Sequence, residues 1–304
     1  MDKIGQDMSI RTQRKGFALM ITLSVLAVVI ALTVVLLSYF KEVKEDASHT
    51  QALIQANLFY ADIVEQFGKF KEKKALFDQL YLYPVALSAA EGRFSMTLIC
   101  EPLAKGVNIN WLALAKDNKK QIQYQEAQNL FDLLVQEHNV EDPIRLREML
   151  LAAIKNDNKT ITSGQSRLRQ KEGIISYKQF EKIISEYQLE VDDLEVDKIT
   201  WKKYFSFSKE TDKIDAEYSS PELLSLLFDI DLASVRDWTS SIEKTSLKTF
   251  VNNNAGGYDE KKSLFAEENF LDLSYCEVSY GEGYRFTFDY IEGEAKHFEF
   301  YGKY

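Results

Sequence analysis

FALMITLSVLAVVIALTVVLLSYF, residues Phe17 to Phe40, is a run of 24 residues without one charged side chain. As an α-helix it would be about 36 Å long, which exceeds the roughly 30 Å thickness of a bilayer's hydrocarbon core. Its hydroxyl groups can hydrogen-bond to carbonyls of their own helix, so they are compatible with lipid. We therefore predict a single transmembrane helix over Phe17 to Phe40, in contact with the lipid bilayer.

The residues on either side of this run predict its orientation. Arg11, Arg14 and Lys15 precede it directly, and basic flanks stay on the cytoplasmic side. From Lys41 onward, 45 acidic residues outnumber 33 basic ones, and this acidic bulk would lie outside. A cleaved secretory signal is the alternative, but the run is long and its exit, Tyr39 to Glu42, offers no A-x-A cleavage site.

Composition excludes several classes of protein. The 304-residue chain is large enough for one or two domains, and its net charge of −10 argues against a nucleic-acid partner bound through phosphates. No G-x-S-x-G, H-E-x-x-H or phosphate-loop motif is present, so we predict that the chain is not an enzyme. Two cysteines, Cys100 and Cys276, exclude a four-cysteine zinc site; whether they pair or stay free thiols is left open.

The helical pattern continues beyond the membrane run. From Phe17 to Phe67 there is neither Gly nor Pro, and Gly68 with the lysine-rich residues after it predicts the end of the helix. Apolar residues recur mostly at three- and four-residue spacing and predict one stripe that packs on a globular head: Val43, Ala47, Leu53, Ile54, Leu58, Ala61, Val64, Phe67. The whole rod would be roughly 75 Å long.

The region outside the membrane predicts an α+β fold. Strand patterns lie at both of its ends, over residues 80–87, 93–100, 270–279, 284–291 and 297–301. Helical patterns fill its middle, over residues 127–138, 143–154, 176–187, 223–228 and 234–244, with Asp142, Ser176 and Ser220 before helix starts. We therefore expect a small antiparallel sheet on the rod and a helical insertion of roughly 140 residues.

The junction Arg14-Lys15-Gly16-Phe17 resembles the class III signal of type IV prepilins and pseudopilins. In that family a prepilin peptidase cuts after the Gly on the cytoplasmic side and methylates the new N-terminus. The resemblance implies cleavage after Gly16 and methylation of Phe17, with the peptidase as a partner. Ile21 then takes the fifth mature position, where major pilins and pseudopilins carry Glu.

Further features resemble the K-type minor pseudopilin of type II secretion, which typically lacks that Glu, is unusually large and carries a helical domain inserted in the pilin sheet. Removal of 16 residues from the 304 would leave 288. Gly106 to Leu112 (GVNINWL) is similar to the family's entry to the helical domain, and Asp212 to Leu224 (DKIDAEYSSPELL) to its later I-N-x-N-T-A-x-P-E-V-L segment. Asp215 and Glu217 depart from the polar residues of that later segment.

The resemblance implies a domain plan and a function. The plan is a cytoplasmic leader (1–16), a transmembrane rod (17–68), a pilin-like β head (69–106 and 268–304) and a helical insertion (107–267). The function is that of a minor pseudopilin at the tip of a type II secretion pseudopilus, initiating or capping the filament for protein secretion. The chain would lie in the bacterial inner membrane with its C-terminal region in the periplasm, beside other minor pseudopilins and inner-membrane secretion assembly proteins.

Two other functions stay open: a minor pilin of a type IV pilus or DNA-uptake machine, and a single-pass membrane-anchored sensor or binding domain. We predict no cofactor and no metal site. Calcium is the one metal alternative, because some relatives of the family bind it and an acidic cluster is present: Asp192, Asp193, Glu195, Asp197.

Overall fold

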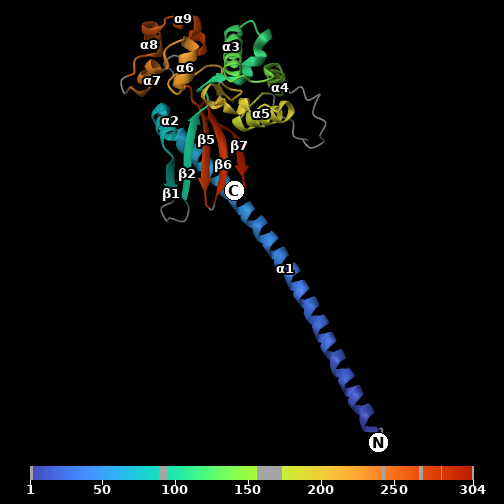
Figure 1. Cartoon of the computed structure of the whole chain (residues 1–304). Helices are drawn as coiled ribbons and strands as arrows, with labels where there is room; N and C mark the ends of the chain where they lie inside the picture. Colours follow the sequence, from blue (N-terminus) through green and yellow to red (C-terminus); the bar gives the residue numbers. More distant parts are fainter. Residues whose placement is uncertain are drawn as a thin grey trace.

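Helix α1, Lys3–Lys69, runs without a break from a bare N-terminal rod into the folded part of the molecule (Figure 1). The computed structural model describes residues 3–88, 95–155, 173–241, 244–266, 270–281 and 283–302, with side chains from residue 19 onward. The predicted end of the helix after Gly68 is confirmed. The rod projects away from every other element, whereas the last part of α1 passes behind the sheet (Figure 1).

A five-stranded antiparallel sheet packs on this last part of α1, with strand order β1-β2-β5-β6-β7. Its strands are β1 (Val85–Ser88), β2 (Ser95–Pro102), β5 (Leu273–Tyr280), β6 (Tyr284–Ile291) and β7 (Glu294–Tyr301). The pairing of β2 with β5 joins the two ends of the outer region, which the sequence places more than 150 residues apart. The predicted α+β fold with a small antiparallel sheet is confirmed.

The strand predicted at residues 80–87 is wrong in its first part. Helix α2 occupies Lys73–Leu82, and β1 begins only at Val85. Phe77 and Leu80, three residues apart, are buried together, as expected for one face of a helix. The alternation that suggested a strand therefore spans a helix end and the start of the next element.

The insertion between β2 and β5 is mainly helical. Its α-helices are α3 (Gln121–Glu137), α4 (Pro143–Lys155), α5 (Tyr177–Val191), α6 (Pro221–Phe228), α7 (Leu232–Ser240), α8 (Leu247–Asn254) and α9 (Tyr258–Lys261). The 3₁₀ turns are η1 (Ile109–Lys116), η2 (Glu195–Lys198), η3 (Trp201–Lys203) and η4 (Lys262–Leu264). Two short parallel strands, β3 (Val107–Asn108) and β4 (Phe205–Ser206), complete it.

Side-chain caps set several of these helix starts as predicted. The hydroxyl of Ser176 accepts a hydrogen bond from the Gln179 amide, and that of Ser220 accepts one from the Leu223 amide. One prediction is displaced: the helix expected at residues 234–244 begins at Leu232, because Asp231 is its cap. Helix α8 was not predicted, since only Phe250 and Val251 of its eight residues are buried and its periodic signal is short.

The folded part contains two large hydrophobic cores. One lies between α1, α2 and the sheet and is rich in aromatic side chains, including Phe67, Phe77 and Phe288. The other lies wholly within the insertion, around Phe131, Phe180 and Trp201. A third, small cluster of Ala104, Leu273 and Ile291 lies where the insertion meets the sheet. We call the sheet with α2 and the packed part of α1 the head.

Candidate assembly surface on the long helix

The first half of α1 is long and apolar enough to cross a membrane, and its residues from Leu19 to Phe40 are all exposed. Hydroxyl groups in it bond to carbonyls of the same helix: Thr22 donates to the Leu19 carbonyl at 2.9 Å and Thr33 to the Val29 carbonyl at 2.8 Å. A bare apolar helix of this length requires lipid or other apolar helices around it, because its side chains from Leu19 to Phe40 are all exposed.

The predicted processing site lies at the start of this half. Gly16 and Phe17 belong to α1 but lie outside the residues whose side chains are described, so cleavage and methylation stay predictions. Ile21 is described, and its side chain is 48% exposed on the bare helix. Under the predicted cleavage after Gly16, the fifth mature position would be an apolar, exposed side chain.

The second half of α1 has two different apolar faces, and the prediction of one stripe packing on the head is wrong. Ala52, Ala56 and Ile63 are buried against the sheet. Ile54 and Leu58 point away from it and are 57% and 60% exposed. Residues two apart on a helix differ by about 200° in direction, so apolar residues at 54 and 58 must face opposite to those at 52 and 56.

The outward face carries a line of apolar residues that we call the outer stripe. It consists of Val43, Ala47, Ile54, Leu58 and Ala61, all exposed. Ala47, Ile54 and Ala61 are seven residues apart, which is the spacing that allows another helix to run alongside. Exposed apolar residues in one line mark an interaction surface, whereas single ones would be ordinary.

Aromatic packing fixes α1 to the sheet. Phe67 meets Phe77 and Tyr290 with ring centres 5.2 and 5.1 Å apart, both edge-on. The Tyr280 hydroxyl, on β5, donates to the Ala52 carbonyl at 2.6 Å. These contacts hold the second half of α1 against the sheet.

Cys100 and Cys276 form a disulfide between β2 and β5, which settles the alternative that the sequence left open. Both are buried in the core of the head. The bond joins the two strands that flank the insertion, and the two cysteines face each other in register. Structural disulfides form and persist in oxidising compartments, not in the cytosol.

The two segments that carried the family resemblance lie together at the base of the insertion. The Asp215 amide donates to the Ala104 carbonyl at 2.8 Å. Asn108 is buried, and its side-chain amide donates to the carbonyls of Ser208 and Thr211 at 2.7 and 2.9 Å. Gly106 is required by space: a Cβ there would lie 2.7 Å from the backbone of Phe205.

The acidic cluster that suggested calcium has a structural use. The buried carboxylate of Asp193 accepts hydrogen bonds from the Glu141 amide at 3.0 Å, the Glu195 amide at 2.8 Å and the Tyr187 hydroxyl at 3.1 Å. It thereby connects the start of α4 to the end of α5. Among the described residues, no group of three His, Cys, Asp or Glu side chains has an arrangement suited to a metal ion.

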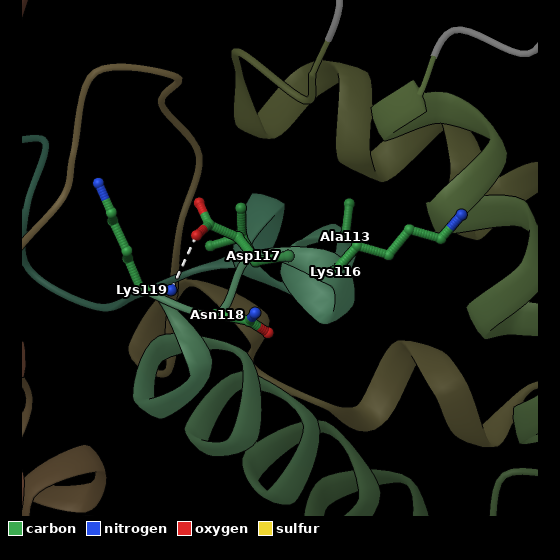
Figure 2. Close-up of a pocket in the computed structure, with 6 residues that line it drawn as sticks. Ala113, Lys116, Asp117, Asn118 and Lys119 are labelled. Atoms are coloured by element: carbon green, nitrogen blue, oxygen red, sulfur yellow. Dashed lines mark hydrogen bonds between the residues drawn. The ribbon is translucent and has the colours of Figure 1, made fainter.

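Hollows on the insertion side of the molecule include the two described next. The first, at the junction of η1 and α3, is open, and its main polar contact is the Lys119 amide donating to the Asp117 carboxylate at 2.9 Å (Figure 2). The second is a cleft between α5 and the polar face of the sheet. In it, His297 contacts Asp289 at 2.7 Å, and Arg285 contacts Glu277 at 3.3 Å.

Comparison with known proteins finds similarity among solved structures. The chain matches no family model and no curated protein sequence. Among solved structures it is similar to a chain in the crystal structure of the GspK-GspI-GspJ complex from the enterotoxigenic Escherichia coli type 2 secretion system. The TM-score is 0.48 at 13% sequence identity, over 83% of this chain and 96% of that one.

Proposed function

We propose that this chain is a non-enzymatic minor pseudopilin of the K type, which begins or caps the pseudopilus of a type II secretion system. The observation that carries the proposal is the division of α1. Its first half is bare and apolar, and its second half packs on an antiparallel sheet while keeping the outer stripe free. This division suits a subunit that is held in a membrane and then packs by its helix among neighbouring helices.

Ile21 supports a place at the end of the filament. A buried Glu in this part of a subunit would need a partner, such as the N-terminal amine of a neighbour, because an unpaired buried charge is costly. Ile21 cannot make that ion pair. Other subunits could still follow this one in the filament. Without the carboxylate, however, it could not form the ion pair with the N-terminal amine of a subunit in front of it.

The compartment follows from the same proposal. The basic residues before Phe17 would keep the N-terminus in the cytoplasm, with the span in the inner membrane. The head and insertion would then fold in the periplasm, where a Cys100–Cys276 disulfide is stable. The outer stripe would contact other minor pseudopilins and the inner-membrane assembly proteins.

The test is the mature N-terminus, measured by mass spectrometry of the membrane fraction with and without prepilin peptidase. We expect a chain that begins at methylated Phe17 only when the peptidase is present. A Gly16→Leu variant, which removes the small residue before the cut, should keep its leader in both strains. A wild-type chain that retains Arg14-Lys15-Gly16 in both strains would refute the proposal and leave a single-pass anchored domain.

A second measurement separates the secretion machine from a pilus. Co-purification of the full chain should recover other minor pseudopilins from cells that express a type II secretion system. Recovery of type IV pilus subunits instead would indicate that the chain belongs to a pilus or DNA-uptake machine. Leu189→Glu, at a residue of α5 that is 88% exposed, is the matched surface control for substitutions in the outer stripe.

A further inference from the structure

A cleft separates the start of helix α5 from the polar face of the sheet. Its volume is about 710 Å³, and it lies between two parts of the molecule that have separate hydrophobic cores, the insertion and the head. Clefts of this volume at such boundaries are typical ligand sites. The two walls come close together where the Lys178 ammonium of α5 lies 5.3 Å from the centre of the Tyr301 ring of β7. The described residues that line the cleft include none of α1, so the cleft is distinct from the outer stripe.

The wall formed by the insertion carries an excess of positive charge. Its charged residues are three lysines and one glutamate: Lys178, Lys182, Lys202 and Glu181. Lys202 is held over the Tyr177 ring at 4.2 Å, much as Lys178 is held over that of Tyr301. Within the described part of the chain, neither Lys178 nor Lys202 forms an ion pair with a carboxylate. A cation over an aromatic ring keeps N–H groups that can donate to a ligand.

The wall formed by the sheet carries an excess of negative charge. Its charged residues are one arginine and three acids, with the histidine of the wall counted as neutral: Arg285, Glu277, Asp289 and Glu299. Two of the acids are paired within the wall, one with Arg285 at 3.3 Å and one with His297 at 2.7 Å. The Glu299 carboxylate accepts a hydrogen bond from the Tyr301 hydroxyl at 2.6 Å.

The two walls therefore differ in the charge that they attract. The remaining charged residues of the lining, Glu101 and Lys105, pair with each other at 2.6 Å and add no net charge. A ligand in the cleft is stabilised when its negative groups face the insertion and its positive groups face the sheet. An α-helix, about 10 Å across with its side chains, is too wide for walls that come within 5.3 Å at Lys178 and Tyr301. An extended peptide is narrower, and its successive side chains point to opposite sides.

We propose that this cleft binds an extended segment of a partner protein in which acidic and basic residues alternate. The acidic side chains of the segment pair with Lys178 and Lys202 on the insertion, and its basic side chains pair with Glu299 and the other acids of the sheet wall. The rings of Tyr177 and Tyr301 beside these lysines give the aliphatic parts of the segment an apolar surface. The site goes beyond the role proposed for α1 and stands whether or not the chain works as a pseudopilin.

Two peptides of equal composition test the proposal on the full chain in detergent micelles. Acetyl-Glu-Lys-Glu-Lys-Glu-Lys-amide alternates its charges, whereas acetyl-Glu-Glu-Glu-Lys-Lys-Lys-amide places them in blocks, and neither has a net charge. Because each ion pair contributes up to about fivefold, the alternating peptide should bind about tenfold more tightly at low salt, as measured by fluorescence anisotropy of dye-labelled peptides. At about 1 M salt, where charges are screened beyond about 3 Å, the difference should fall below about twofold. Equal binding of the two peptides at low salt, or binding of neither, would overturn the proposal.

A charge-reversed variant assigns the preference to the cleft. Lys178→Glu with Lys202→Glu makes both walls acidic, so it should lose the preference for the alternating peptide. The control is Lys119→Glu with Lys198→Glu, at two exposed lysines of the insertion that do not line the cleft, and it should keep the preference. Acetyl-hexalysine-amide should bind the first variant more tightly than the control, which has the same net charge.

The variants also define which results contradict the proposal. A preference that persists in the first variant, or one that is lost equally in the control, would overturn it. Circular dichroism of both variants reports whether they are folded. The comparison of the two peptides on the wild type depends on neither variant, so it decides the proposal even if a variant does not fold.

Discussion

Replacing Cys100 and Cys276 together by alanine would measure how the insertion and the head depend on each other. The disulfide closes a loop with a sequence separation of 176 residues. In the chain-entropy model, loss of a bond that closes a loop of this order would lower the free energy of unfolding by about 5 kcal/mol. That value applies if the whole region between the cysteines unfolds with the head.

The structure predicts a smaller loss. The insertion has its own core, and its ends are held together by the Asp215 amide on the Ala104 carbonyl and the Ile214 amide on the Leu264 carbonyl, at 2.8 and 2.7 Å. An insertion that stays folded while the head unfolds shortens the effective loop to about 15 residues. The expected loss for a loop of that size is about 3 kcal/mol.

The assay can follow the two parts separately. All three tryptophans, Trp111, Trp201 and Trp238, lie in the insertion, so their fluorescence in urea reports its unfolding. Hydrogen exchange of the β5 and β6 amides reports the head. We expect the double alanine variant to lower the stability of the head by about 3 kcal/mol and to leave the tryptophan transition within about 0.5 kcal/mol.

Two outcomes would contradict this reasoning. A loss near 5 kcal/mol with an equal shift of the tryptophan transition would show that head and insertion unfold as one unit. A loss below about 1 kcal/mol would show that the unfolded head is already constrained without the bond.

Two other substitutions address the outer stripe and the base of the insertion. Leu58→Glu should abolish co-purification of partner subunits. It should change the free energy of unfolding by less than about 0.5 kcal/mol, because the Leu58 side chain is exposed to solvent. Recovery of partners equal to that of the Leu189→Glu control would contradict a role of the outer stripe in assembly. Gly106→Ala should lower the free energy of unfolding of the insertion by about 1–3 kcal/mol, because the added Cβ would overlap the backbone of Phe205. A tryptophan transition in urea that does not shift would contradict this and show that β3 and β4 can move apart.

The sequence predicted those features that depend on short stretches of chain. The uncharged run of 24 residues predicts a membrane span by its length alone. Alternation predicts β5, β6 and β7, and serines before helical patterns predict the starts of α5 and α6. Each of these signals comes from residues within about ten positions of one another, where local geometry relates sequence to structure.

The tertiary structure decided what depends on residues far apart in the chain. Pairing of Cys100 with Cys276 requires β2 and β5 to be neighbours in register, and no local pattern specifies a partner strand. Apolar residues lie on more than one face of the second half of α1, so the sequence alone does not show which face is buried. Only the position of the sheet determines that Ala52 is buried while Ile54 stays exposed. The ion pair between Lys74 and Glu217 forms only when α2 meets the insertion, because it joins residues of two elements that lie far apart in the chain.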